Sequence, residues 1–240
     1  MPLDGRLRTL NRVYKDKEAI EVLDHALTQF GDTALVSSFG AESVVLLHMA
    51  AQIDVSVPVI FIDTEMLFPE TLKYQREVAE TLGLTDVRVI QASREAVFER
   101  DNENLLHLHD PDACCHLRKT EPLEKALHGF DTWVSGRKRY QGGSRAALEH
   151  FELERPMGRL PRTKINPLAH WDSSDLQSYI ATHNLPRHPL VAKGFPSVGC
   201  TPCTTRVGAG ESARAGRWRD QSKTECGIHF GGGTATRVVN

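Results

Sequence analysis

The first 135 residues alternate short apolar runs with stretches whose apolar side chains repeat at helical spacing, and this alternation limits the possible folds most. Strands are expected at 33–39, 57–62, 86–90 and 132–135. Helices are expected at 16–30, 40–52, 69–83 and 93–106. Because the strands are apolar on both faces, they fit a parallel sheet covered by helices on each side. The pattern therefore predicts an α/β fold with a Rossmann-like parallel sheet.

Ligands of such sheets bind at the carboxyl ends of the strands. The loops at 37–43, 63–68 and 136–145 all follow predicted strands. The first reads Ser-Ser-Phe-Gly-Ala-Glu-Ser and leads into a helix, so its backbone N–H groups and the helix N-terminus suit an anion. Its candidate residues are Ser37, Ser38, Gly40 and Ser43. A plain strand-to-helix turn is equally compatible with this loop, which lacks the Gly-Lys-Ser/Thr of a Walker motif.

Two basic segments stand out in a chain whose net charge is only -2. Four cations lie in 136–145 and three in 214–219. Guanidinium groups bind phosphate and sulfate oxygens in pairs, so a small polyanionic substrate is indicated. Ordinary solvated surface is the alternative for either segment alone. RNA binding also stays open, although the segments lack aromatic interleaving of the kind that stacking platforms use.

The chain has five cysteines, four of which form two close pairs. Cys114 and Cys115 are adjacent, and Asp112 is expected to cap the short helical turn that carries them. Cys200 and Cys203 form a Cys-Thr-Pro-Cys knuckle. Neighbouring residues on a helix point about 100° apart, so a bulky iron–sulfur cluster suits this set better than one zinc ion. Structural zinc and buried inert thiols are the alternatives.

Cys226 is the fifth cysteine and lies among basic residues. Lys223 and His229 are three residues away on either side. Cations lower the pKa of a thiol and favour the nucleophilic thiolate. The glycines that follow predict a mobile segment able to close over a site. An incidental cysteine in a frayed terminus is the alternative.

The organisation of the chain changes after residue 150. Prolines become frequent from residue 156, one helix is predicted up to residue 183, and the last forty residues are rich in Gly and Arg. Two parts are expected: an α/β domain at 1–195 and a knuckle with a catalytic tail at 196–240. The N-terminus lacks the apolar segment of a signal peptide, and no run is long enough to span a membrane. The cytoplasm is therefore expected, where disulfides are rare.

Taken together, these segments resemble the assimilatory adenylyl-sulfate (APS) and phosphoadenylyl-sulfate (PAPS) reductases. The resemblance covers roughly 30–230 and rests on Ser-Phe-Gly-Ala-Glu-Ser at 38–43, Asp-Thr at 63–64, Cys-Cys-His-Leu-Arg-Lys at 114–119, the segments 68–71, 136–145, 200–203 and 214–218, and Glu-Cys-Gly-Ile-His at 225–229. It implies an adenine-nucleotide α-hydrolase-like domain, with Cys226 as the nucleophile that attacks the sulfate sulfur. AMP would leave, and a thioredoxin or glutaredoxin would release sulfite from the resulting S-sulfocysteine.

The resemblance also implies the site residues. Cys114, Cys115, Cys200 and Cys203 would hold a [4Fe–4S] cluster that acts electrostatically and structurally. The expected substrate-binding residues are Ser37, Ser38, Gly40, Ser43, Ile62, Lys119, Lys138, Arg139, Arg145, Arg214, Arg217 and His229.

The cysteine pattern separates the two substrates of this family. Members that use PAPS typically lack the four cluster cysteines, so APS is the expected substrate here, in sulfate assimilation and cysteine biosynthesis. PAPS, or both substrates, is the alternative. A less favoured alternative is an ATP-pyrophosphatase-type sulfur-transfer enzyme, which would need a fuller Ser-Gly-Gly-x-Asp-Ser loop. A metal-bearing RNA-binding protein is a further alternative. We expect a homo-oligomer that binds neither nucleic acid nor membrane.

Overall fold

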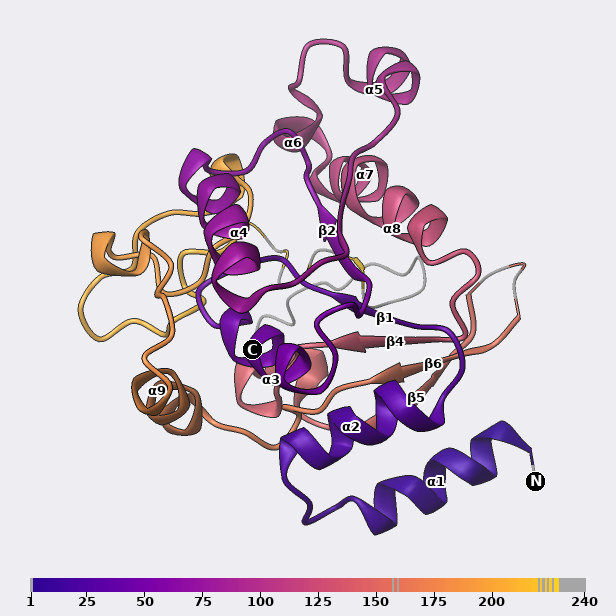
Figure 1. Cartoon of the computed structure of the whole chain (residues 1–240). Helices are drawn as coiled ribbons and strands as arrows, with labels where there is room; N and C mark the ends of the chain where they lie inside the picture. The colour runs from indigo at the N-terminus through magenta and orange to yellow at the C-terminus, as the bar shows by residue number, and fades with distance from the viewer. Residues whose placement is uncertain are drawn as a thin grey trace.

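The computed structural model describes residues 2–156, 158, 160–219, 221, 223, 225, 227 and 228. One six-stranded sheet with the order β3-β2-β1-β4-β6-β5 forms the centre of this part of the chain (Figure 1). The strands are β1 Thr33–Val36, β2 Val59–Ile62, β3 Val87–Ile90, β4 Thr132–Ser135, β5 Phe151–Glu154 and β6 Arg162–Ile165. All neighbouring pairs are parallel except β5 and β6, which run antiparallel at one edge. The predicted parallel α/β sheet is confirmed.

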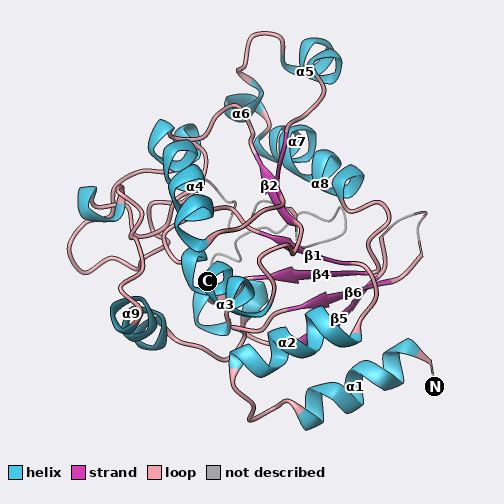
Figure 2. Ribbon diagram, in the orientation of Figure 1, coloured by secondary structure: helices cyan, strands magenta, loops and turns pink. Residues whose placement is uncertain are grey.

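Helices cover both faces of the sheet, as Figure 2 shows. They are α1 Leu3–Val13, α2 Ala19–Gln29, α3 Ser43–Ile53, α4 Pro69–Leu82, α5 Arg94–Asp101, α6 Leu106–His109, α7 Pro111–Cys115, α8 Glu121–Ala126 and α9 Ser173–Thr182. Alternate residues of each central strand enter different cores. In β1, Leu35 packs with α2, α3 and α4, whereas Ala34 packs with α8. The two apolar cores explain why these strands read as continuous apolar runs.

The strand order reverses direction at β1. The chain adds β2 and β3 on one side of β1, then returns to place β4 and β6 on the other. Crevices of open α/β sheets form at such a switch, outside the carboxyl ends of the two strands. The loops that follow β1 and β4 are 37–43 and 136–145. The topology therefore brings the predicted anion loop and the predicted basic loop together.

Several elements were not predicted from the sequence pattern, among them α1, α6, α8, β5 and β6. Helix α1 packs against β5, and β5 and β6 form an edge hairpin. Strand β6 reads Arg-Thr-Lys-Ile and is buried along its length. Its Arg162 pairs with Glu154 of β5, and its Lys164 lies directly opposite Glu152. Cross-strand partners of opposite charge stabilise this hairpin, and Phe151, Leu153 and Ile165 attach it to the core.

The predicted helix at 93–106 is interrupted. It ends with α5 at Asp101, and Asn104 adopts a left-handed conformation with φ 57° before α6 begins. The chain then continues through α7 into a π-helical turn, His116–Thr120, and on into α8. In the described part of the chain, no helix has the length and apolar character needed to cross a membrane.

Candidate active site

A cavity of about 250 Å³ lies at the carboxyl ends of β1 and β4. Most of the predicted substrate-binding residues line it: Ser37, Ser38, Gly40, Ser43, Ile62, Lys119, Lys138, Arg145, Arg214 and Arg217. Arg139 is the exception among the described residues. Its guanidinium donates to the carbonyl of Leu148 and pairs with the exposed Glu149, so the structure does not bring it into the cavity.

The loop 37–43 forms the cavity wall above β1. The hydroxyl of Ser37 accepts the N–H of Phe39 at 3.2 Å, and the hydroxyl of Ser43 accepts the N–H of Gly40 at 3.0 Å. Phe39 has φ 46°, and its ring is fully buried against Phe61 with 5.2 Å between ring centroids. Because the ring points into the core, the bulky residue at this position takes no room from the cavity. The loop is thus held by packing and by its own hydroxyls.

The basic loop 136–145 is less exposed than its charge suggests. Lys138 is buried and donates to Glu42 at 2.7 Å, and Tyr140 donates to the same carboxylate. Desolvation by burial lowers the pKa of Lys138, although Glu42 opposes this effect. Glu42 thus neutralises one predicted anion-binding cation. Arg145 remains directed at the cavity with a guanidinium only 10% exposed.

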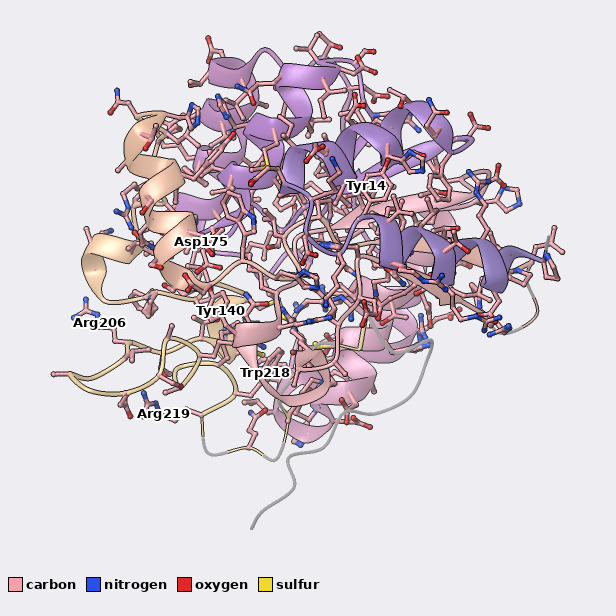
Figure 3. All side chains as sticks on the ribbon, turned by 90° about the horizontal axis from the view of Figure 1, so that it is seen from below. Tyr14, Tyr140, Asp175, Arg206, Trp218 and Arg219 are labelled. Carbon is pink, nitrogen blue, oxygen red and sulfur yellow. The ribbon has the colours of Figure 1, made fainter. Side chains whose placement is uncertain are left out.

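The basic turn Arg214–Arg219 forms another part of the cavity wall. The aromatic face of Trp218 lies 4.4 Å from the guanidinium carbon of Arg217, which also donates to the carbonyl of Val198. A Cβ at Gly216 would lie 2.1 Å from the carbonyl oxygen of Thr205, so only glycine fits this close approach. Figure 3 labels Trp218 and Tyr140, both of which line the cavity. The buried Nε of Arg217 has no hydrogen-bond partner in the described structure.

The four paired cysteines are buried and unbridged. Cys114 and Cys115 end α7, directly before the π-helical turn. The hydroxyl of Thr64 lies 3.2 Å from the sulfur of Cys200. The carbonyl of the same Thr64 accepts from the buried Arg118 at 3.1 Å. The loop after β2 therefore contacts both the knuckle and the π-helical turn that follows the other cysteine pair.

The thiols interact electrostatically across the two pairs. Burial raises the pKa of Cys114 to about 12, and the thiols of Cys115 and Cys200 raise it further. Burial likewise raises the pKa of Cys203, with contributions from Cys200 and Cys115. Burial also acts to raise the pKa of Cys200, but the charge of Lys119 and hydrogen bonds from Thr64 and Lys119 outweigh it, so this pKa is lowered. Lys119 is thus a counter-charge for the cysteine set.

Buried sulfurs of this kind ionise readily only beside a positive centre. Four thiolates from two segments fit an iron–sulfur cluster in donor type and number. Within the described residues, no three Cys, His, Asp or Glu side chains are placed to hold a single metal ion. The predicted cap is corrected: Asp110 accepts the N–H groups of Asp112 and Ala113, because it precedes the first helical residue. Asp112 instead pairs with Lys223.

Several cavity residues escaped the pattern analysis. Glu42, Thr64 and Glu225 lie within predicted motifs, but only the fold shows what their side chains contact. Thr71 also lines the cavity, and its hydroxyl lies 3.0 Å from the Nε2 of His188 in the core. That pair is separated by 117 residues, and no local pattern links them.

The predicted nucleophile Cys226 and the predicted substrate ligand His229 lie outside the described residues. Glu225, Gly227 and Ile228 are described, and Glu225 and Ile228 line the cavity. The side chain of Ile228 packs against the core between the sheet and α8.

Comparison with known proteins gives consistent matches. The family profile described as "Phosphoadenosine phosphosulfate reductase domain" matches residues 32–206. Proteins named adenosine 5′-phosphosulfate reductase are similar to most of the chain. The one from Chelativorans sp. (strain BNC1) is 44% identical over 96% of this chain and 94% of its own length. The one from Streptomyces coelicolor is 42% identical over 91% of each.

Solved structures show the same fold. A phosphoadenylyl-sulfate (PAPS) reductase from Candida auris, determined as a phosphate complex, has a TM-score of 0.70 and 28% identity, covering 83% of this chain and 96% of that one. An FMN adenylyltransferase from Candida glabrata has a TM-score of 0.57 and 16% identity, and the match covers 82% of this chain and 69% of that one. The latter likeness concerns the fold alone.

Proposed function

We propose that this chain, which belongs to the phosphoadenosine phosphosulfate reductase domain family, reduces adenosine 5′-phosphosulfate (APS) to sulfite and AMP in sulfate assimilation and cysteine biosynthesis. One observation carries the proposal. Arg145, Arg214 and Arg217 meet at a cavity that also exposes Cys200 of the buried cysteine set. Proteins named for this activity are similar over nearly the whole chain.

The cavity suits an adenylyl group with a strongly anionic end. Loop 37–43 offers backbone N–H groups and hydroxyls near the start of α3, where phosphate is favoured. The three arginines supply guanidinium forks for sulfate and phosphate oxygens. We assign the adenylyl part to the loop side and the phosphosulfate to the arginine side, near Lys119. Arg139 has no part in this assignment.

The first chemical step uses Cys226, an assignment that rests on sequence. Its thiolate attacks the sulfate sulfur, forming an S–S bond while the S–O bond to the phosphate breaks. AMP leaves with that bonding pair, and the enzyme retains an S-sulfocysteine. Two anions must approach each other in this step, so the arginines and Lys119 reduce the repulsion. Cations around the site thus serve both binding and reaction.

In the second step, a thiolate of a dithiol reductant attacks the sulfur of Cys226 and expels sulfite. The second thiol of the reductant then resolves the mixed disulfide and restores the Cys226 thiol. Thioredoxin or glutaredoxin has the required chemistry. The 196–240 segment would open to admit this protein. We further propose a cytoplasmic homo-oligomer.

The cysteine set is proposed to hold a [4Fe–4S] cluster through Cys114, Cys115, Cys200 and Cys203. When bound, the cluster supplies structural cohesion and a local electrostatic field. Lys119, which lines the cavity and faces Cys200, links that field to the substrate side. Anaerobic purification should yield a brown protein with broad visible absorbance and bound iron and sulfide. A colourless zinc protein would contradict the cluster.

Mass spectrometry tests the mechanism directly. The protein is mixed with APS in the absence of any reductant and then digested. We expect a sulfite-sized adduct on the peptide containing Cys226, and none in the Cys226→Ser variant. Unmodified wild-type protein would contradict the covalent mechanism.

PAPS reduction is the second candidate. It is favoured by the likeness to the PAPS reductase from Candida auris, at 28% identity. Comparing kcat/KM for APS and PAPS on one preparation decides between them, and we expect APS to be preferred.

A further inference from the structure

Thr71 is a polar side chain of the cavity wall that belongs to neither basic segment. It lies in the first turn of α4, the helix that follows β2, and is only 2% exposed (Figure 1). Its hydroxyl lies 3.0 Å from the Nε2 atom of His188, a buried ring. Either atom of such a pair can be the donor, and the choice decides what Thr71 can offer a ligand.

The other ring nitrogen of His188 settles which atom donates. Its Nδ1 accepts the backbone N–H of Leu190 at 3.2 Å, and a backbone N–H can only donate, so Nδ1 carries no proton. Burial lowers the pKa of His188 to about 4, so the ring is neutral at neutral pH and its single proton is on Nε2. The Nε2–H group therefore donates to the hydroxyl oxygen of Thr71.

The hydroxyl proton of Thr71 must then point away from His188. A threonine hydroxyl has one proton, and among the described residues no second group accepts a hydrogen bond from this one. A buried donor without an acceptor is costly. Because Thr71 lines the cavity, an acceptor on a bound ligand would complete the network.

The ring of His188 is held in place by α4 itself. Tyr74, almost one turn after Thr71, packs its ring edge-on at 4.8 Å between centroids. The hydroxyl of Tyr74 also donates to the carbonyl of Pro186 at 2.8 Å. These contacts tie the segment 186–190 to the helix that carries Thr71. His188 is therefore a positioning residue, which fixes the donor before a ligand arrives.

We propose that the Thr71 hydroxyl donates a hydrogen bond to a ring nitrogen of the substrate's adenine. This inference rests on the proposed function, which puts the adenylyl group in this cavity. The apolar side chains of Ile62, Leu67 and Val198 line the same cavity and suit a flat aromatic base. An uncharged hydroxyl suits a ring nitrogen, whereas the phosphosulfate is matched by guanidinium groups. Thr71 would thus contribute to recognition of the base.

Calorimetric titration with AMP tests the donor. Thr71→Val keeps the shape of the side chain without the hydroxyl and should bind AMP about tenfold more weakly than wild type. Thr71→Ser keeps the hydroxyl and should restore most of the affinity. Thr33→Val is the matched control, because that hydroxyl donates to the carbonyl of Gly31 at 2.9 Å at the start of β1, the end away from the cavity. It should bind AMP like wild type.

AMP analogues then identify the acceptor. In 1-deaza-, 3-deaza- and 7-deaza-AMP, one ring nitrogen is replaced by a C–H group. One of these analogues should bind wild type about tenfold more weakly than AMP does, and should lose no further affinity in Thr71→Val, because the same hydrogen bond is already gone. Losses that add in full for all three analogues would overturn the assignment to the base.

Nitrogen-15 NMR of the histidine rings tests the positioning role without a change in the cavity. The His188 signal, identified by its loss in His188→Asn, should show the proton on Nε2 at neutral pH. A proton on Nδ1, or equal AMP binding by Thr71→Val and wild type, would overturn the donor and leave the proposed function intact. If wild-type protein fails to bind AMP at all, the proposed substrate site is wrong as well.

Discussion

Loop 37–43 and the group formed by Arg145, Arg214 and Arg217 line the same cavity but are held in different ways. The loop is fixed by the buried ring of Phe39 and by the hydroxyls of Ser37 and Ser43. The arginines are held by the carboxylate of Glu225, the amide of Gln141 and the ring of Trp218. Core packing cannot be exchanged for a ligand, whereas an ion pair can. Damage to the loop should therefore reduce stability, and damage to the arginines should reduce activity.

The largest expected effect is the loss of the Phe39 ring. Phe39→Ala should lower the free energy of unfolding by about 3–5 kcal/mol, because the cavity left against Phe61 is fully buried. Denaturant unfolding measures this change. Phe98→Ala is the control, since that ring is 74% exposed and its loss should cost less than about 0.5 kcal/mol. Equal losses in the two variants would show that packing does not hold the loop.

In the arginine group, the substitution Arg145→Lys keeps the positive charge but removes the planar guanidinium fork. We expect kcat/KM for APS to fall about a hundredfold, while the melting temperature changes little. Arg219→Lys makes the same replacement at a guanidinium that pairs with Glu211 away from the cavity, and it should retain wild-type turnover. A large loss of stability with unchanged turnover in Arg145→Lys would show that this arginine supports the fold rather than the reaction.

Acid should weaken the packed core around Thr71 and Tyr74 and leave the arginines charged. Burial lowers the pKa of His188 to about 4, while the guanidinium groups stay charged. The unfolded chain binds a proton near pH 6.5 and the folded chain only near pH 4. This contribution to stability is therefore complete above pH 6.5 and lost as the pH falls toward 4, by at most about 3 kcal/mol.

His188→Asn should flatten that part of the stability profile, as read from unfolding between pH 4 and 7. His128→Asn, at an exposed site, should leave the profile unchanged. If the stability of His188→Asn depended on pH as strongly as that of the wild type, the His188 imidazole would not be the source of the loss of stability in acid.

The smallest expected change lies within the loop itself. Ser43→Ala removes the hydroxyl that accepts the N–H of Gly40 at 3.0 Å. Stability should fall by about 1 kcal/mol in the absence of nucleotide. Saturating AMP should leave this difference from wild type in place, because the phosphate is assigned to the arginines. A difference that disappears with AMP would place the phosphate on the loop instead.

The sequence pattern was most informative where one physical effect dominates. The strand at 132–135 was predicted with its observed bounds, because its apolar residues serve the cores on both faces. Strand β6 was missed because its buried Arg162 and Lys164 look like surface residues until their partners on β5 are known. Residue type therefore predicted the central strands correctly but did not predict the charged strand β6 near the edge of the sheet.

The same limit applies to the cavity. The basic segments were recognised as anion-binding, yet the pattern could not show which cations already have a partner. Lys138 is neutralised by Glu42 across 96 residues, and Arg139 turns toward Leu148 and Glu149. Glu225 was noted only as part of a motif, although its carboxylate lies on Arg145, 80 residues earlier. Pairings over such separations depend on the fold.

The π-helical turn His116–Thr120 has a consequence for tolerance to insertion and deletion. A wider turn of this kind holds one residue more than an α-helix uses for the same stretch. Deleting one residue there would restore regular winding with little change of direction, because four α-helical residues turn the chain by about as much as five residues of the wider turn. The cysteines at the end of α7 should then keep their direction relative to α8. The wider turn thus lets this stretch carry one more residue, among them the buried Arg118 and Lys119, without re-aiming the cysteines.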